Sequence, residues 1–271
     1  MKCYWGIKLM KKKILIVVLT FLMIFNTCLY ALAEDKSYEI KEAGITLSIP
    51  EEWVVFERIV DEFDENLELV NSSKEKLEEI FKERDIYLNA IMLPQNYEIV
   101  VNLNEFKGSQ EIFDFNTFSE KELNILGKKL LEDNFPEETG VAYSGYEIYN
   151  HSQAKFIVFD IIKNVDGQEI YGKQYYTIIN GQALYITLYS YIGEIEEDKA
   201  NEINNIVNTI KFEEVKEKPK AGFFSQETFL NIGVKLVLGS IALLIFGSIT
   251  LLVVWIKKRS SKKSDEEYFE D

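Results

Sequence analysis

Histidine and cysteine, the side chains that most often serve as nucleophile partners or metal ligands, are scarce in this 271-residue chain. His151 is the single histidine, and Cys3 and Cys28 lie in an N-terminal segment that we expect to be removed. A thiol protease and a multi-histidine metal site are therefore excluded for the mature chain. A serine nucleophile would depend on His151, whose neighbours Asn150 and Ser152 indicate a surface turn without a G-x-S-x-G pattern. We predict no catalytic residue.

Carboxylates are abundant, and the run Asp61, Glu62, Asp64 and Glu65 offers the oxygen ligands that calcium prefers. The run lacks the alternating Asp-x-Asp-x-Asn-Gly register of a calcium loop, so we favour a solvated loop and expect no metal or other cofactor. Paired carboxylates could also act as acid and base in the hydrolysis of envelope glycans. Because acidic sequences contain such pairs by chance, an extracellular hydrolase is the alternative function and not the preferred one.

Tyrosines of two expected strands form a more distinctive pattern. Tyr185, Tyr189 and Tyr191 alternate with leucine and isoleucine, and Tyr175 lies on the preceding strand. If the face opposite the leucines is open, these rings form a platform for sugars or a peptide. If helices cover that face, the tyrosines belong to the core. We favour the core interpretation, because three amphipathic helices need sheet to cover.

Hydrophobic periodicity predicts the elements that position these residues. Alternation and turn residues indicate strands at 37–41, 45–49, 53–56, 86–93, 97–103, 141–149, 154–163, 169–179 and 183–191. Helices are expected after a capping box at Ser72 and Glu75, from Thr117 with Glu120, and over 196–209. Asn180-Gly181 between apolar runs is the strongest hairpin signal in the chain.

The apolar run of residues 156–159 does not alternate, which indicates a strand that is covered on both faces. Long runs of strands with helices at three points predict an α+β domain, an antiparallel sheet sandwiched between helices.

The order of these elements resembles the family of the photosystem II extrinsic protein PsbP and its bacterial relatives. The resemblance rests on Ile45-Thr-Leu-Ser-Ile-Pro-Glu-Glu-Trp53, on the hairpin at Asn180-Gly181 with Tyr185-Ile-Thr187, and on a closing helix that ends in Ile210-Lys-Phe212. It covers residues 36–213. It implies an α/β/α sandwich and a role in binding partners or stabilising assemblies, and it transfers no ligand motif to this chain.

Both ends of the chain carry apolar segments. Residues 1–33 have a basic start, an apolar core of about a dozen residues and small residues near Ala33, so we predict a signal peptide cleaved between Ala33 and Glu34. A retained N-terminal anchor and a lipoprotein site at Cys28 are the other interpretations. Near the C-terminus, residues 236–256 contain no charge and are long enough to cross a bilayer.

Lys257, Lys258 and Arg259 follow this apolar stretch directly, which places the C-terminus in the cytoplasm by the positive-inside tendency. The predicted organisation is therefore a signal peptide (1–33), an extracellular α+β domain (34–213), a juxtamembrane stalk (214–231), a transmembrane helix (232–256) and a cytoplasmic tail (257–271).

Charge limits the partners of this domain. The chain carries a formal net charge of −15, and residues 34–220 are more acidic still, because many of the cations lie at the two ends. Nucleic acid and an anionic membrane surface would be repelled. We expect a single-pass protein of the bacterial cell membrane that binds an envelope protein or glycan. An element of assembly or signalling acting through the membrane helix is a third possibility.

Overall fold

The computed structural model describes residues 35–62, 64–93, 95–133, 141–165 and 167–218. The predicted signal peptide, most of the stalk, the membrane helix and the tail lie outside these residues. The chain divides into two compact units, and the larger contains residues 37–49 and the described residues from 53 onwards. Of the smaller unit, residues 35–36 and 50–52 are described. Within the described ranges, no helix has the length and apolarity of a membrane span.

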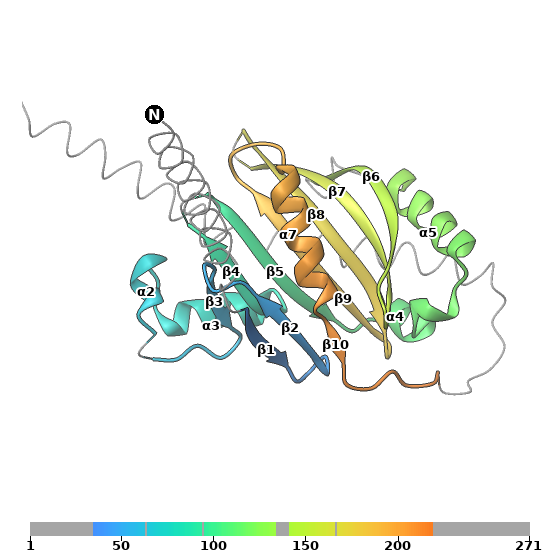
Figure 1. Cartoon of the computed structure of the whole chain (residues 1–271), viewed down its shortest axis with the longest axis horizontal. Coiled ribbons are helices and arrows are strands. Elements are labelled where there is room, and N and C mark those ends of the chain that lie inside the picture. The colour runs from blue at the N-terminus through green and yellow to red at the C-terminus, as the bar shows by residue number, and fades with distance from the viewer. Residues whose placement is uncertain (1–34, 63, 94, 134–140, 166, 219–271) are drawn as a thin grey trace, which may run out of the picture. The chain divides into compact units, whose positions relative to one another are not determined.

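A seven-stranded antiparallel sheet forms the centre of the larger unit (Figure 1). In spatial order its strands are β3 (Val54–Glu57), β4 (Ile86–Met92), β5 (Tyr97–Asn104), β9 (Gln182–Ser190), β8 (Gln168–Ile179), β7 (Lys155–Val165) and β6 (Val141–Asn150). The last of these seven strands in sequence, β9, therefore lies between β5 and β8 and joins the two halves of the sheet. These strands lie within two residues of the predicted positions.

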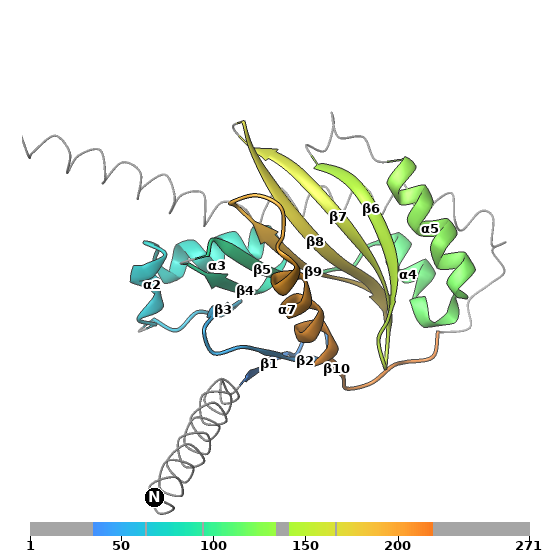
Figure 2. The ribbon, with the colours of Figure 1, turned by 45° about the horizontal axis from the view of Figure 1, so that its top comes forward.

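The two faces of this sheet are covered by different layers (Figures 1 and 2). On one face, α3 (Lys74–Glu83) lies near β4 and α5 (Glu120–Glu132) lies near β6. On the other face, α7 (Glu197–Asn208) packs together with a small sheet of β1 (Lys36–Ile40), β2 (Ile45–Ile49) and β10 (Lys211–Phe212). The predicted α+β class is confirmed, with the difference that a second sheet supplements the helix on one side.

Each face has its own hydrophobic core, because side chains alternate between the two sides of a strand. The α3/α5 face buries Leu77 and Phe81 of α3 and Leu126 of α5 against the sheet. The α7 face buries Ile203 and Val207 against another set of sheet residues. Residues 156–159 are at most 1% exposed, so this strand is covered on both faces as its sequence predicts.

Helix starts differ slightly from the predicted ones. Ser73, not Ser72, is the N-cap of α3, and its hydroxyl accepts the backbone N–H of Lys76. The capping box of α5 is Ser119 with Glu122, two residues beyond the predicted pair. In both helices a neighbouring serine takes the N-cap position in place of the predicted residue. Both candidates have the hydroxyl group that an N-cap needs, so local sequence does not distinguish between them.

Three short elements were not predicted: α4 (Lys107–Ile112), the 3₁₀ helix η1 (Phe115–Thr117), and β10. A fourth, α2 (Asn66–Leu69), follows directly after the acidic run that ends at Glu65. All are six residues or shorter, and periodicity gives little signal over such lengths.

The turn between β8 and β9 is the predicted Asn-Gly hairpin. Asn180 has φ 56° and Gly181 has φ 82°, which are the left-handed conformations that a two-residue turn between twisted strands requires. This turn also holds the end of the domain, because the side-chain amide of Asn180 donates to the Glu214 carbonyl and accepts the Lys216 N–H.

A second side-chain amide, that of Gln153, binds the backbone of Phe212, which lies just before these residues. The side chain of Gln153, in the turn between β6 and β7, accepts the backbone N–H of Phe212 and donates to its carbonyl. Lys218 donates to the Glu111 carbonyl. The first residues of the predicted stalk are thus attached to the domain, and we call residues 211–218 the exit segment.

Candidate functional site

Polar side chains occupy the middle of the sheet face that lies under α3 and α5. Strand register places Tyr189, Glu98 and Tyr143 in one row across the strands. In the next row, Gln174 of β8 pairs with Thr187 of β9. The row after that is formed by Tyr176 and Tyr185, and Ile148, Ile157 and Asn102 lie in it too. We call Tyr143, Gln174, Tyr176, Tyr185, Thr187 and Tyr189 the polar face.

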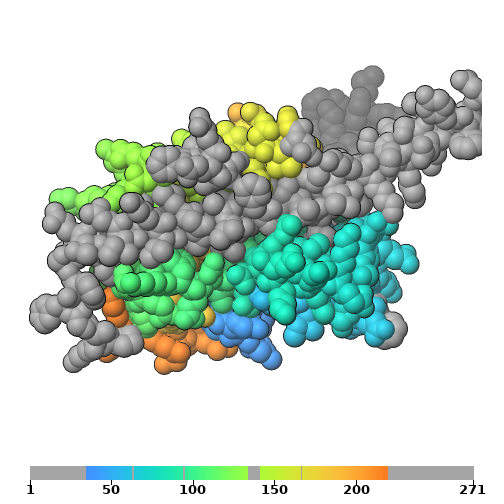
Figure 3. Space-filling model, turned by 180° about the vertical axis from the view of Figure 1, so that it is seen from behind, coloured from blue at the N-terminus to red at the C-terminus, as the bar shows by residue number. Residues whose placement is uncertain are grey.

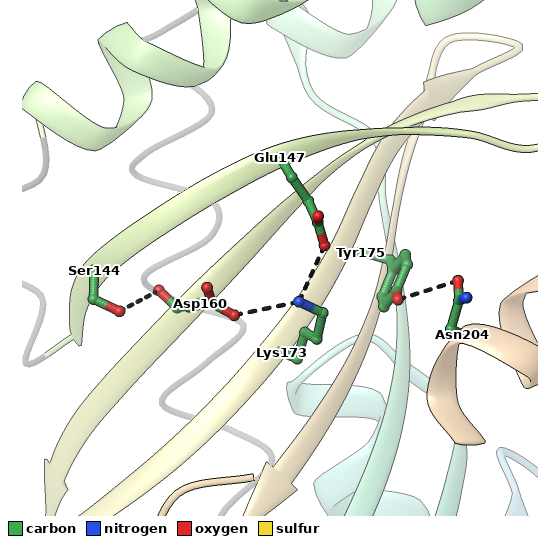
Figure 4. A network of polar contacts seen from close by, with 6 residues as sticks. All are labelled: Ser144, Glu147, Asp160, Lys173, Tyr175 and Asn204. Carbon is green, nitrogen blue, oxygen red and sulfur yellow. Dashed lines mark hydrogen bonds and ion pairs between the residues drawn. The ribbon is translucent and has the colours of Figure 1, made fainter. Parts of the chain in front are cut away.

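All four tyrosines singled out in the sequence are buried. Tyr175, Tyr185, Tyr189 and Tyr191 are 0–4% exposed, so they do not form an open platform. The core interpretation describes them correctly. Tyr175 is moreover separated from the others, because it lies on the α7 face, where its hydroxyl is 3.5 Å from the Asn204 side chain (Figure 4).

Tyrosine hydroxyls gather on the polar face. The rings of Tyr176 and Tyr185 stack at 4.8 Å between centroids, and Phe115 of η1 packs edge-on against Tyr176. Burial raises the pKa of Tyr176 well above its usual value, and the nearby Tyr185 and Tyr143 hydroxyls add to the effect. Burial likewise raises the pKa of Tyr143, with further contributions from Tyr185 and Tyr189. These phenols therefore stay protonated at neutral pH.

Several polar atoms on this face have no hydrogen-bond partner. They are Tyr143 Oη, Gln174 Oε1 and, further along on β4, Asn89 Oδ1. The amide nitrogen of Gln174 is engaged, because it donates to Thr187 Oγ1 at 3.2 Å. Buried polar atoms without partners are rare and costly in folded proteins.

A carboxyl group lies at one side of the polar face. Glu98 is fully buried, with Oε1 accepting from Asn89 Nδ2 at 2.6 Å and Oε2 accepting from the Tyr191 hydroxyl. Burial raises the pKa of Glu98 to about 7, although both hydrogen bonds and the Arg84 guanidinium oppose the shift. Glu98 therefore exchanges its proton near neutral pH, a property that sequence inspection missed because nothing in the sequence places this residue inside.

A second ionisable group on the same side of the sheet is Lys163 of β7. Burial lowers the pKa of Lys163 to about 8, and the positive charge of Arg84 contributes in the same direction. Arg84 follows α3 and also lies within electrostatic range of Glu98. One end of this face therefore carries charge, whereas its centre consists of phenols, an amide and a hydroxyl.

His151 is buried in the turn between β6 and β7, and not in a surface loop as predicted. Its ring lies edge-on to Phe156 and Phe212, and Nδ1 accepts the Gln153 N–H at 3.2 Å. Burial lowers the pKa of His151, so the ring is neutral at physiological pH. These contacts give the histidine a packing role where the chain leaves the domain.

The acidic run of Asp61, Glu62, Asp64 and Glu65 lies directly before α2. Asp64 accepts the backbone N–H of Asn66 at the start of α2. Among the described residues, no three His, Cys, Asp or Glu side chains are arranged to hold a metal ion.

A charged network lies on the α7 face of the sheet (Figure 4). Lys173 Nζ is 3.1 Å from Glu147 and 3.5 Å from Asp160, both of which are largely exposed. Because the ammonium group lies near both carboxylates, it balances one of their two charges. Exposed ion pairs of this kind contribute little to stability.

No family model matches the chain, and no curated protein matches it. Solved structures do. Cyanobacterial PsbP from Synechocystis matches with a TM-score of 0.39 and 8% identity over 67% of this chain and 94% of that one. LpqN of Mycobacterium tuberculosis, involved in cell envelope biogenesis, matches with a TM-score of 0.33 and 12% identity over 69% and 91%.

The immunity protein TplEi of Pseudomonas aeruginosa, solved with a peptide, has a TM-score of 0.35 and 7% identity over 66% of this chain and 98% of that one. A PsbP protein, from the family that the sequence resembles, is thus among the structures that match.

Figure 3 shows the molecule from behind. The α3 region (teal) occupies one end of the surface, and the region from α4 to α5 (green) occupies the other.

Proposed function

We propose that this chain is an exported, single-pass membrane protein whose α+β domain lies outside the cell and binds a component of the cell envelope. Export and anchoring are supported by the pattern of the two ends, a basic start with a short apolar core and an uncharged stretch of about 21 residues followed by Lys257, Lys258 and Arg259. The domain between them has its own two cores, which suits a module that folds outside the membrane.

The observation that carries the binding function is the polar face with its partnerless atoms. Phenols, a carboxamide and a hydroxyl are hydrogen-bonding groups. Because burial raises the pKa of Tyr143 and Tyr176, these phenols serve as hydrogen-bond donors and acceptors and not as bases or nucleophiles. Such a set favours recognition over catalysis.

The alternative, a hydrolase using two carboxyl groups, has weaker support. Glu98 has a pKa suited to a general acid, but it is fully buried and both of its oxygens already accept hydrogen bonds. Glu147 and Asp160 are exposed, yet the ammonium group of Lys173 lies close to both of them. Binding is therefore the preferred function.

Two experiments test this function. The full chain, tagged at its C-terminus, is expressed in a bacterium with one membrane, and protease is added to intact cells. We expect the domain to be digested while the tag on the cytoplasmic tail stays intact. Cross-linking in intact cells, followed by purification through the tag, then identifies the bound envelope component. A domain that is protected in intact cells and digested only after lysis contradicts the proposal.

A further inference from the structure

We infer that strand β6, at one edge of the large sheet, is a docking site for an extended peptide segment in which apolar and cationic residues alternate. The segment adds to the sheet as one further antiparallel strand. This inference goes beyond the proposed function, because it concerns a surface other than the polar face and names the chemistry of a protein partner. Its basis is a row of outward backbone groups that lies between two different side-chain environments.

β6 is a long strand at one side of the sheet. It contains 10 residues, and among the described residues it pairs only with β7 (Figure 1). Natural proteins protect such edges with lysine, proline, short strands or bulges. β6 contains neither lysine nor proline. Its one irregularity lies between Tyr143 and Gly145, which leaves the run from Tyr146 to Asn150 in regular register. This run is therefore suited to pairing with a further strand.

The register shows which backbone groups of this run face outwards. The His151 N–H donates to the Ala154 carbonyl at 2.9 Å, so these two residues form a hydrogen-bonded pair. Hydrogen-bonded and non-hydrogen-bonded pairs alternate along an antiparallel ladder, so Tyr146, Ile148 and Asn150 belong to non-hydrogen-bonded pairs. Their N–H and C=O groups point away from β7, and no hydrogen bond among the described residues reaches them. An added strand supplies partners for all of them.

The face of β6 that lies under α5 requires apolar side chains in the partner. Tyr146 and Ile148 are half-buried on this face and pack against its hydrophobic core. Residues directly opposite each other on neighbouring strands have their side chains on the same face. The partner residues opposite Tyr146 and Ile148 therefore extend the apolar surface of the core, and valine or isoleucine suits these positions.

The opposite face requires a cation. The side chain of Glu147 is 63% exposed there, and that of Asp160, on the neighbouring strand, is 59% exposed. The ammonium group of Lys173 lies between these two carboxylates, so one negative charge remains unbalanced (Figure 4). A lysine or arginine opposite Glu147 balances this charge.

The charge of the whole chain also favours a cationic segment over a second copy of this chain. The formal net charge is −15, which attracts a basic partner and repels an identical acidic domain. Pairing of β6 with its own copy would moreover bring no cation to the edge, because β6 contains neither lysine nor arginine.

The test uses the full chain, purified in detergent, and a short fluorescent peptide in which lysine and valine alternate. Two methylated forms of this peptide are compared by fluorescence anisotropy. In the antiparallel arrangement valine lies opposite Tyr146 and Ile148, so the backbone N–H groups of the valines face β6. Those of the lysines face away from it. Methylating the valine nitrogens therefore removes donors to β6, whereas methylating the lysine nitrogens spares them.

We expect the unmodified and the lysine-methylated peptides to bind with similar affinity. The valine-methylated peptide should bind at least about ten-fold more weakly, because it loses more than one hydrogen bond to β6. Two results overturn the inference: the unmodified peptide does not bind, or the two methylated peptides bind equally. The second result would mean that charge alone holds the peptide.

Variants of the edge test the same contacts from the side of the protein. Ile148→Pro removes an outward N–H and no bond to β7, so it should weaken binding about ten-fold while the sheet persists. Glu147→Lys should weaken binding about five-fold more than Glu169→Lys does. Glu169→Lys is the matched control, because it makes the same charge change at an exposed residue of β8, away from this edge.

Near-ultraviolet circular dichroism checks that the variants fold. If Ile148→Pro does not fold, the two methylated peptides on the unaltered chain still decide the question. Undiminished binding by folded Ile148→Pro overturns the inference. So does a dimer of the unaltered chain, seen by analytical ultracentrifugation, that Ile148→Pro dissociates, because a second copy would then occupy the edge. Digestion of the domain on intact cells tests the proposed function separately and is unaffected by any of these results.

Discussion

Glu98 shows how burial changes the chemistry of a single residue. In the folded chain its pKa is about 7, whereas a carboxyl group in an unfolded chain titrates near its ordinary value of 4.5. The folded state therefore binds the proton more tightly than the unfolded state between these two values. As the pH rises from 4.5 to 7, the free energy of unfolding therefore falls progressively. Above pH 7 the charged, buried carboxylate of Glu98 destabilises the folded chain by a constant amount.

Replacing this carboxyl group with an amide should remove that penalty. We predict that Glu98→Gln raises the free energy of unfolding by about 3 kcal/mol at pH 8 and has little effect at pH 4. Asn89 can still donate to the new side chain, and the Tyr191 hydroxyl can turn to accept from it. Urea unfolding of the two chains at a series of pH values measures the difference.

The control for Glu98→Gln is the same substitution at a glutamate that is exposed to solvent. Glu105→Gln, at an exposed position just after β5, serves as the control and should produce no pH-dependent difference. A constant difference between Glu98→Gln and the unaltered chain from pH 4 to pH 8 would show that Glu98 titrates normally.

At the scale of elements, the packing of α5 on the sheet depends on a missing side chain. A Cβ atom at Gly127 would lie 2.6 Å from the ring of Tyr146 on β6 and 3.3 Å from Ile157 on β7. The helix can approach these strands closely because this position carries no side chain.

Gly127→Ala should therefore destabilise the domain, although alanine is the better helix former. The gain in helix propensity is about 1 kcal/mol, and overpacking a tight contact costs about 1–3 kcal/mol, so we expect a net loss of about 1 kcal/mol. Thermal unfolding measures the effect. In a Tyr146→Ala background the clash is removed, and the same substitution should then stabilise; equal destabilisation in both backgrounds would contradict this explanation.

The exit segment is the second feature at this scale. Two side-chain amides, from Gln153 and Asn180, each form a donor and an acceptor bond with its backbone. The direction in which the chain leaves the domain is consequently determined by the turns of two hairpins.

Asn180→Gly should loosen this segment without disturbing the turn, because glycine adopts positive φ freely. We predict that hydrogen exchange of residues 213–218 becomes about five-fold faster, with little change in the sheet. Asn96→Gly, at another turn residue with φ 57°, provides the comparison and should leave this exchange rate unchanged. Unchanged protection in Asn180→Gly would mean that the amide does not hold the exit segment.

At the scale of the whole molecule, the proposed anchor determines where the domain works. If residues 232–256 span the membrane, a chain that ends at Lys218 keeps every described element and loses its attachment. We predict that this truncated chain is recovered from the culture medium, and that a chain lacking only residues 257–271 stays in the membrane fraction. Immunoblotting of the two fractions makes the measurement, and membrane retention of the chain ending at Lys218 would refute the proposed anchor.

Local sequence determined most of the secondary structure. Alternating apolar residues marked the strands of the large sheet, and the Asn180-Gly181 pair marked its central hairpin, because side-chain alternation and positive φ are properties of a few neighbouring residues. The α+β class followed from the order of strands and helices. The two terminal segments, read from hydropathy and charge, remain predictions.

Tertiary structure alone decided how the candidate site is built. Tyr175 and Tyr176 are neighbours in sequence and lie on opposite faces, and only the second belongs to the polar face. Glu98 and Tyr191 meet because β9 inserts beside β5, a pairing between distant parts of the chain. Long-range pairing depends on the free energy of burying both faces of the sheet at once, and no local pattern of residues records that sum.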